Sequence, residues 1–376
     1  MAQPNNFGFG EDETMLRDSA RRWFAENYSA ERLHGLVAAN NDPHRPNDVV
    51  WVREDWQAIT QLGWAAACVP ESAGGAGLPF VAAVGLAEEA GRASYPGPLA
   101  ATLTATAVLN VCGGMVAEAA LGEVAAGRAF GVAVAGAQGV VDGSTDVRNE
   151  AGRLNGMAQW VQDARKVDRF VVAAGDSSGT GLYLVDAGAA GLTIAPDAIV
   201  DLTRDQACLR FENCEAAELV APGHGEAALE AALPALLILA CADMVGAGEW
   251  LLQTTADYAR TREQFDRPLG FFQAIKHPLV NVMIAIDRAR SLTWHAGCAI
   301  DHEPADALRL ARMAKSEASD MAGFAASRAV QFHGGIGFTW ECYVHLFFKR
   351  QIHSQVLLGD ARYHRALLAE VMIDAA

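Results

Sequence analysis

The chain is poor in basic residues relative to acidic ones, and it has no pair of cysteines spaced to share a metal ion. Its 29 lysines and arginines against 45 acidic residues give a net charge of −16. This balance argues against a nucleic-acid partner and leaves any bound polyanion dependent on a few local cations. The 7 cysteines are scattered without a C-x-x-C pair. We therefore expect buried, reduced thiols, with neither a zinc site nor a disulfide framework.

The sequence also lacks a long apolar run and a recognisable leader. Its longest apolar run, residues 233–242, stops at Asp243 and is shorter than a membrane span requires. The first residues show no charged segment followed by an apolar one. With 376 residues and 51% hydrophobic composition, the chain can bury a large core divided among two or three domains. We expect a soluble, cytoplasmic protein.

The spacing of apolar residues changes twice along the chain and predicts three domains. Residues 1–122 are mostly helical, because apolar residues recur every three or four positions in segments such as 13–28 and 51–62. Residues 123–226 contain short β-branched and apolar segments between turn residues, which predicts a small β domain. Residues 227–376 return to helical spacing. The predicted order is therefore helices, strands and a helix bundle.

Individual elements follow from the same spacing. The strands are expected at residues 130–134, 169–173, 181–185, 191–194 and 207–211. The four helices of the last domain are expected at residues 227–260, 275–300, 304–332 and 341–373. Two glycine-rich segments are interpreted as connections. The glycines of residues 69–79 could cradle a phosphate, but without a preceding strand this segment is better explained as a turn joining two helices. Residues 175–181 have strands on both sides and form a hairpin.

Two separated motifs in the last domain carry groups suited to a phosphate-bearing ligand. Residues 260–273 (RTREQFDRPLGFFQ) lie at a helix end, where Pro268 and Gly270 stop the helical period. Residues 331–337 (QFHGGIG) end a long helical pattern with three glycines, which let backbone approach a ligand closely. Either motif alone is better explained by an exposed arginine or a glycine helix stop. Together they favour a binding site.

With both motifs in hand, the chain resembles the acyl-CoA dehydrogenase family over nearly its whole length. The resemblance implies a mainly α fold, with an N-terminal helical domain, a central β-barrel or sandwich domain and a C-terminal four-helix bundle. It also implies FAD, whose ADP half is held by the two motifs while the cofactor is bound mainly to a neighbouring subunit. A guanidinium pairs with two pyrophosphate oxygens at once. By resemblance the ADP-binding residues are Arg262, Phe265, Gln273, Gln331, Gly334 and Gly335.

The region that would contact the flavin ring departs from the family pattern. Family members have a loop with Thr-Glu-Pro and Gly-Ser-Asp sequences after the first strand of the β domain, whereas residues 131–143 here read GVAVAGAQGVVDG. A Trp-Ile-Thr stretch beside the ring is replaced by Trp160, Val161 and Gln162. Trp160 is therefore a candidate flavin contact by resemblance, with an ordinary core residue as the alternative.

The catalytic base is the larger departure. Oxidising a thioester at its α,β bond requires a carboxylate that removes the α-proton, and desolvation raises the pKa of that carboxylate toward neutrality. In most of the family this is a glutamate at the position of Leu358, just before Gly359. A minority place it near the position of Leu236. This chain has leucine at both.

Three other carboxylates are candidate bases, and each has a structural explanation. Asp360 ranks first but is more readily explained as a helix cap. Glu341 could begin a helix beside its positive end. Asp243 lies about two turns beyond the minority position on the same helix face, too far to act at the same carbon. We assign His333 and His345 to structural or cofactor-adjacent roles.

Three hypotheses follow. In the first, the chain is a subunit of an FAD-dependent acyl-CoA dehydrogenase and contributes the ADP-binding half of an FAD site, while a paralogous subunit supplies the glutamate in an α2β2 heterotetramer. Some bacterial members built in this way act on steroid side-chain CoA esters. In the second, it is a self-sufficient homotetramer with Asp360 as base. In the third, it is a non-catalytic structural or acyl-CoA-binding subunit.

The resemblance implies electron-transfer flavoprotein as the electron acceptor and an acyl-CoA as substrate, but the acyl group stays open. Small residues on the first long helix of the last domain are Ala240, Ala242 and Gly246. They fit either room for a bulky substrate or close packing between helices.

Overall fold

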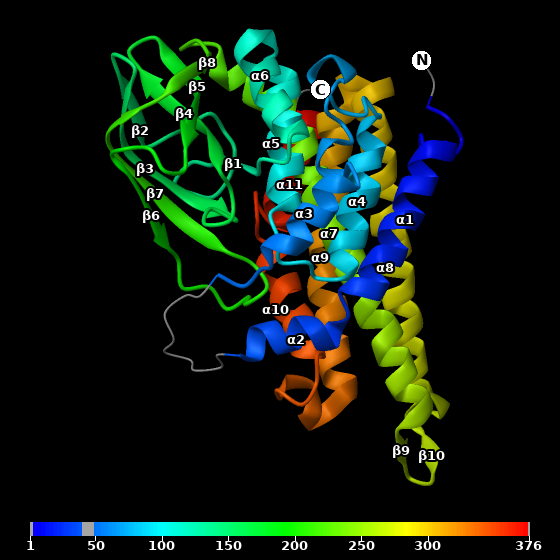
Figure 1. Ribbon diagram of the computed structural model, residues 1–376. Coiled ribbons are helices and arrows are strands. Elements are labelled where there is room, and N and C mark those ends of the chain that lie inside the picture. Colours follow the sequence, from blue (N-terminus) through cyan, green and yellow to red (C-terminus); the bar gives the residue numbers. More distant parts are fainter. Residues whose placement is uncertain (1–2, 40–48, 375–376) are drawn as a thin grey trace.

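A computed structural model describes residues 3–39 and 49–374 and confirms the expected order of helices, sheet and helices (Figure 1). Residues 1–2, part of the segment read for a leader, lie outside the described residues. The helices before the sheet are α1 (Glu11–Asn27), α2 (Ala30–Ala38), α3 (Arg53–Gln61), α4 (Phe80–Arg92), α5 (Leu99–Cys112) and α6 (Gly114–Ala125), with short turns η1 (Trp64–Ala66) and η2 (Glu71–Ala73). The predicted connection at residues 69–79 contains η2 and leads into α4, which confirms its interpretation.

Eight strands of the described residues form one sheet in the order β6-β7-β3-β2-β4-β5-β8, with β1 paired to β4. Their bounds are β1 (Phe130–Ala133), β2 (Val147–Glu150), β3 (Arg153–Gln162), β4 (Arg169–Asp176), β5 (Gly179–Asp186), β6 (Leu192–Pro196), β7 (Gln206–Glu215) and β8 (Ala217–Val220). The strands expected from the sequence are found, and the 175–181 segment is the β4–β5 hairpin. The spacing missed β2, β3 and β8, because many of their residues are polar, exposed or only partly buried.

The helices after the sheet are α7 (Gly225–Thr261), α8 (Gln273–His302), α9 (Pro304–His333), α10 (Val344–Ser354) and α11 (Ala361–Ala369). A hairpin of β9 (Glu263–Gln264) and β10 (Arg267–Pro268) with the turn η3 (Leu269–Phe271) joins α7 to α8. The turn η4 (Gly334–Phe338) follows α9, and η5 (Glu370–Asp374) ends the described chain. The first three predicted helices are confirmed within a few residues.

The predicted single helix over residues 341–373 is wrong. It is divided into α10 and α11 by a turn in which Leu358 and Gly359 have φ of 59° and 97°, values that an α-helix does not contain. The helical spacing of apolar residues continues through this turn, so the spacing alone does not reveal that the helix ends there. The predicted domain boundaries near residues 122 and 226 fall inside the last turn of α6 and the first turn of α7. They stay predictions.

Helix α7 lies at the centre of the bundle and packs against α4, α5, α8, α9 and α10. By length and composition it could cross a membrane, but 78% of its most apolar stretch is buried inside the protein. This is the burial expected of a core helix.

The small residues of α7 serve two purposes. A Cβ on Gly246 would lie 1.9 Å from the backbone oxygen of Glu88 on α4, and one on Gly91 of α4 would lie 2.3 Å from the oxygen of Asp243. The two helices therefore touch through their backbones, which explains Gly246 by packing. Ala240 instead lines the cavity described below.

The cysteines are all free. Burial raises the pKa of both Cys68 and Cys241 to about 12, so neither thiol ionises near neutral pH. Across residues 3–39 and 49–374, no group of three or more His, Cys, Asp or Glu side chains could hold a metal ion.

We expect Gly246→Ala to lower the free energy of unfolding by roughly 1–3 kcal/mol, because the added Cβ forces α4 and α7 apart. Urea unfolding followed by circular dichroism measures the loss. Gly35→Ala on α2 is the matched control, since a Cβ there meets nothing within 4 Å. Alanine's higher helix propensity should raise its stability by up to about 1 kcal/mol. Equal losses in both variants would contradict the packing explanation.

Candidate functional site

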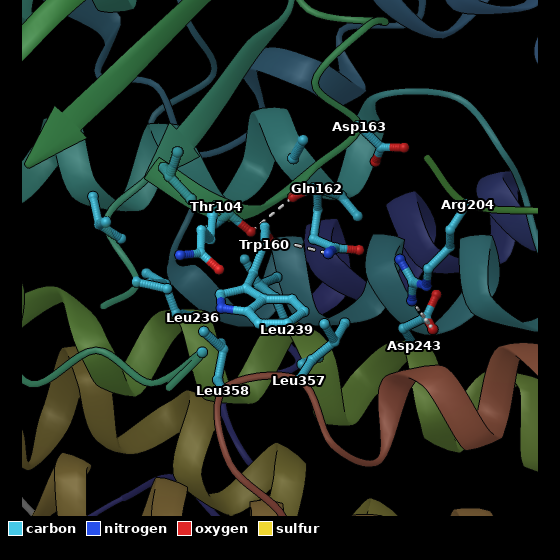
Figure 2. A pocket seen from close by; sticks show the side chains of 18 residues that line it. Thr104, Trp160, Gln162, Asp163, Arg204, Leu236, Leu239, Asp243, Leu357 and Leu358 are labelled. Carbon is cyan, nitrogen blue, oxygen red and sulfur yellow. Dashed lines mark hydrogen bonds and ion pairs between the residues drawn. The ribbon is translucent and has the colours of Figure 1, made fainter. Parts of the chain in front are cut away.

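A cavity lies between the sheet and the helices, and Figure 2 shows it from close by. The space between its walls totals about 870 Å³, part of it open to solvent. Its walls come from α5, β1 and the loop after it, β3, the segment before β7, α7, and the turn between α10 and α11. The lining residues are Ala100, Ala101, Thr104, Val132, Val134, Ala135, Gly139, Gln159, Trp160, Gln162, Asp163, Arg204, Leu236, Leu239, Ala240, Asp243, Leu357 and Leu358.

The two positions at which the sequence lacks an expected glutamate meet in this cavity. Leu236 comes from α7 and Leu358 from the turn before α11, and both lie beside the Trp160 ring in Figure 2. Leu239 and Leu357 complete the same apolar wall. This part of the cavity therefore offers no proton acceptor.

Trp160 lies at the cavity and is not a core residue. It is 42% exposed, and its indole Nε1 donates to the Ala137 oxygen at 3.2 Å, which ties β3 to the loop after β1. Its φ of 62° is in the left-handed region, at an irregularity of the β3–β7 pairing between Ala158 and Val161. A bulge re-aims a side chain, and here it turns the indole toward the cavity.

Several polar side chains at the wall are already bonded to neighbouring groups. Gln162 Nε2 donates to Gln206 Oε1 at 2.7 Å, and Gln162 Oε1 accepts from His353 Nε2 at 3.1 Å. Burial lowers the pKa of His353 to about 4, so this imidazole is neutral at pH 7 and uses its single N–H for that bond. Asp163 is buried and paired with Lys166 at 2.8 Å. These groups leave few free partners for a ligand.

Asp243 lines the same cavity but is bound by two arginines. Its Oδ1 accepts from Arg350 Nη2 at 2.5 Å, and its Oδ2 accepts from Arg204 Nη2 at 2.6 Å. Arg204 also donates to Ser354 Oγ at 2.9 Å. From the sequence, Asp243 is expected to lie too far from Leu236 along α7 to act at the same carbon. The structure gives a different reason, since both residues line the cavity and it is pairing that occupies the carboxylate.

The pKa of Asp243 excludes it as a base. Burial alone would raise this pKa, but the adjacent Arg204 and Arg350 guanidinium groups outweigh burial and hold the pKa below its ordinary value. A general base works best with a pKa near the operating pH. Sequence reasoning missed both arginines. The one local sign was an aspartate inside an apolar helix, because a buried carboxylate needs a partner.

The other two candidate carboxylates lie away from the cavity wall. Asp360 is the N-cap of α11, and its Oδ1 accepts from the Tyr363 N–H at 2.8 Å. This bond satisfies one of the free amides at the helix start. Glu341 is exposed and precedes Tyr343, the N-cap of α10.

The two singled-out histidines are buried in contacts outside the cavity. His333 donates from Nδ1 to the Ala329 oxygen at 2.8 Å. His345 meets the ring of Trp340 edge-on, with centroids 4.8 Å apart, and burial lowers its pKa to about 4. Neither lines the cavity.

The first sequence motif forms the β9–β10 hairpin at the far end of α7 and α8 (Figure 1). Gln264 pairs with Arg267, so Phe265 and Asp266 are the two turn residues, each with φ of 56°. Such a turn normally carries Asn-Gly, and a bulky residue there is strained. The Phe265 residue is nevertheless 86% exposed. Strain combined with exposure motivates a binding role for this ring.

Arg262 and Gln273 flank this hairpin. Arg262 is the C-cap of α7, and its side chain is exposed. In the part of the chain that the structure describes, no acidic side chain forms an ion pair with it. Gln273 is the exposed first residue of α8. Both side chains are therefore available to a ligand.

The second motif ends α9 beside the first. Gln331, Gly334 and Gly335 are exposed, and a Cβ on either glycine would meet no atom within 4 Å. Tyr258 of α7 stacks on His333 of α9 with centroids 4.4 Å apart, which joins the ends of the two helices. The structure thus brings both motifs to one end of the bundle.

The cavity and this end of the bundle are far apart within one chain. The part of α7 between the cavity-lining residues and Arg262 spans roughly 30–40 Å at 1.5 Å per residue. A dinucleotide whose flavin ring lay in the cavity would not reach Arg262 of the same chain.

Two family models match the chain. The model described as acyl-CoA dehydrogenase, N-terminal domain, matches residues 10–127, and the model described as acyl-CoA dehydrogenase, C-terminal domain, matches residues 223–373. The matched segments are the helices on either side of the sheet, and they include both candidate motifs.

Similar proteins span the whole chain. Acyl-CoA dehydrogenase IpdE2 of Mycobacterium tuberculosis is 31% identical over 94% of this chain and 94% of its own length. IpdE2 of Mycolicibacterium smegmatis is 30% identical over 96% and 99%. A solved variant of the Tcur3481-Tcur3483 steroid ACAD has 29% identity and a TM-score of 0.86 over 97% of this chain and 99% of its own. The ChsE4-ChsE5 complex from Mycobacterium tuberculosis has 25% identity and a TM-score of 0.86 over 98% and 99%.

We expect Asp243→Asn to lower the free energy of unfolding by about 3 kcal/mol or more at pH 7, because it leaves two largely buried guanidinium groups without a carboxylate. The folded pKa of Asp243 lies below its unfolded value of about 3.9. Its stabilisation is therefore present above about pH 4 and is lost as the pH falls through the folded pKa.

Urea unfolding of the wild type and the variant from neutral to acid pH measures the difference between their free energies of unfolding. This difference should become smaller only as the pH falls below about 4. Asp360→Asn keeps a capping side chain and should be nearly neutral at every pH. A cost of Asp243→Asn that is the same in acid and at pH 7 would contradict the ionic role.

Proposed function

The chain belongs to the acyl-CoA dehydrogenase family, and we propose that it is the subunit of a heteromeric FAD-dependent enzyme that supplies the ADP-binding half of the cofactor site. A paralogous subunit supplies the flavin pocket and the catalytic glutamate in an α2β2 assembly. The observation that carries the proposal is a contrast between two sites of the same chain. Exposed phosphate-binding groups lie at the end of the bundle, whereas the cavity has no available base.

The end of the bundle fits the ADP half of FAD. Arg262 is exposed and lacks an acidic partner among the described residues, so its guanidinium is available to pyrophosphate oxygens. The open space beside Gly334 and Gly335 lets a phosphate or ribose approach the backbone. The exposed amides of Gln273 and Gln331 add donors and acceptors at the same end. The strained, exposed ring of Phe265 adds an aromatic surface.

The cavity fits the flavin ring poorly. The ring needs hydrogen-bonding partners along its polar edge, but Gln162 is committed to Gln206 and His353. The strand and loop on that side present Val132 and Val134 to the cavity. When bound, FAD supplies the acceptor for the hydride removed from the acyl thioester. We propose that this chain holds and orients the other end of that cofactor.

The lack of a base in the cavity supports a paralogous source for it. Leu236 and Leu358 offer no proton acceptor. Of the acidic residues that line the cavity, Asp163 is paired with Lys166, and Asp243 is paired with two arginines. A carboxylate with a raised pKa therefore has to come from another chain.

The relatives support the nature of the partner and substrate. The two compared structures are named as pairs, Tcur3481 with Tcur3483 and ChsE4 with ChsE5, and the first is named a steroid ACAD. We extend this to the present chain as part of the proposal. The partner is a second acyl-CoA dehydrogenase chain, the substrate is a CoA thioester of a bulky, steroid-type acyl group, and the acceptor is electron-transfer flavoprotein in the cytoplasm.

The two competing functions gain less support. A self-sufficient homotetramer needs Asp360 as base, but this carboxylate caps α11 and is not among the cavity-lining residues. A non-catalytic subunit would bind no flavin at any interface, which leaves the exposed groups around Arg262 without a role.

Expressed alone, the chain should bind little flavin, and co-expressed with an acyl-CoA dehydrogenase encoded by a neighbouring gene it should co-purify as a yellow complex. The visible spectrum measures flavin per complex, and addition of acyl-CoA should bleach it. Full flavin occupancy and turnover by the single chain would overturn the proposal. A co-purified complex that stays colourless would instead favour the non-catalytic subunit.

In that complex, Arg262→Ala should weaken FAD binding about tenfold to hundredfold, because charge-assisted bonds to phosphate contribute on the order of 1.5–3 kcal/mol. Titration of the apo complex with FAD, followed by flavin fluorescence, measures the change. Arg260→Ala is the matched control, since Arg260 is also exposed, lies two residues away and is already paired with Asp257. Equal effects of the two substitutions would point to general charge instead of a phosphate contact.

A further inference from the structure

The turn between α10 and α11 holds a residue of the cavity wall in a strained conformation. Leu358 has φ of 59°, in the left-handed region that costs an ordinary residue on the order of 1–2 kcal/mol. Its side chain lines the cavity. Strain of this kind persists only where surrounding contacts enforce it.

A buried ammonium group supplies those contacts. Lys315 of α9 is 0% exposed. Its Nζ donates to the backbone oxygens of Gln355 and Gly359, at 3.0 and 2.8 Å. These carbonyls stand on either side of Leu358. The third N–H reaches Ser319 Oγ at 2.8 Å, so all three donors of the ammonium are used.

Two further bonds fix the same turn. Ser319 Oγ donates to the Gln355 oxygen at 2.9 Å, and His364 Nε2 donates to the Leu358 oxygen at 3.0 Å. Both bonds come from helices, α9 and α11, that pack against each other. The turn is therefore held from two sides.

Lys315 has no ion-pair partner in the described part of the chain. Burial lowers its pKa to about 8, so the ammonium form still predominates at pH 7 and presents three N–H groups. A wholly buried lysine without a carboxylate is unusual. Here its charge is stabilised by the oxygens of the turn and of Ser319.

We propose that Lys315 is a positioning residue, which fixes the turn over residues 355–359 so that whichever side chain occupies position 358 stands in the cavity. In this chain that side chain is leucine, and the turn closes the apolar wall beside Leu236 and Trp160. The inference goes beyond the proposed function and does not rest on it, because it requires neither flavin nor a partner chain.

A carboxylate placed at position 358 reports the position of the side chain. In Leu358→Glu, a carboxyl group held in the apolar cavity should have a pKa raised by about 1–2 units above its ordinary value near 4.3. Because the folded pKa then exceeds the unfolded one, this variant should lose stability relative to Leu358→Gln as the pH rises between the two values. Urea unfolding of both full-length variants across that range gives the pKa of Glu at 358, and an unshifted value would overturn the proposal.

Adding Lys315→Met to Leu358→Glu tests the role of the ammonium. If the turn relaxes, the carboxyl group reaches water and its pKa should fall back toward about 4.3. Loss of a nearby positive charge would by itself raise this pKa. The direction of the shift therefore separates positioning from electrostatics, and a pKa that stays the same or rises on Lys315→Met overturns the proposal.

A milder pair of substitutions keeps the test usable where Lys315→Met prevents folding. Ser319→Ala in the Leu358→Glu background retains the ammonium but removes one contact to the turn, and it should lower the reporter pKa by a few tenths of a unit or more. Ser316→Ala is the matched control, because Ser316 is buried on the same helix and donates to the Ala361 oxygen outside the turn. Equal shifts in the two variants would overturn the proposal.

Discussion

Arg350 joins the three parts of the chain through one buried guanidinium group. It pairs with Asp243 of α7, donates to Thr203 Oγ1 at 3.1 Å in the segment before β7, and lies 3.5 Å from the Tyr95 oxygen before α5. Burying such a pair costs desolvation energy that the attraction need not exceed. The clearer effect of Arg350 is on geometry, because its three contacts can form together only when the sheet and the helices lie at a fixed distance from one another. The cavity occupies that spacing.

The same pairing decides what the cavity can do chemically. Asp243 is the carboxylate of α7 that lines the cavity, and its two arginine partners keep it ionised and occupied. With leucine at positions 236 and 358, the wall where a base would stand is apolar. The ion pairs that hold the sheet and the helices together therefore also keep the Asp243 carboxylate from accepting a proton. The same ion pairs of Asp243 thus explain both the position of the helices around the cavity and the lack of a free carboxylate in it.

Local patterns in the sequence predicted the features that depend on residues close together in the chain, such as helices and short motifs. The ends of α7, α8 and α9 came within a few residues, because their apolar repeats are long. The turn between α10 and α11 was missed, since Leu357 and Leu358 continue the helical pattern into it. The motif around Arg262 could be recognised because its residues adjoin. The partners of Asp243, and the bonds from Lys315 to its turn, join residues far apart in sequence, and no spacing rule encodes such pairs.

The length of α7 keeps the two candidate sites of one chain far apart. Because Arg262 lies roughly 30–40 Å from the cavity along one helix, a cofactor held by Arg262 would, under the proposed function, place its ring in the cavity of another chain. In a homo-oligomer that other cavity would be a copy of this one, with Leu236 and Leu358 at both base positions and Asp243 bound by arginines. The held cofactor would then meet no base anywhere in the assembly. The proposed heteromeric assembly avoids this problem, because a partner with a different cavity wall gives the exposed groups at the end of α7 a catalytic purpose.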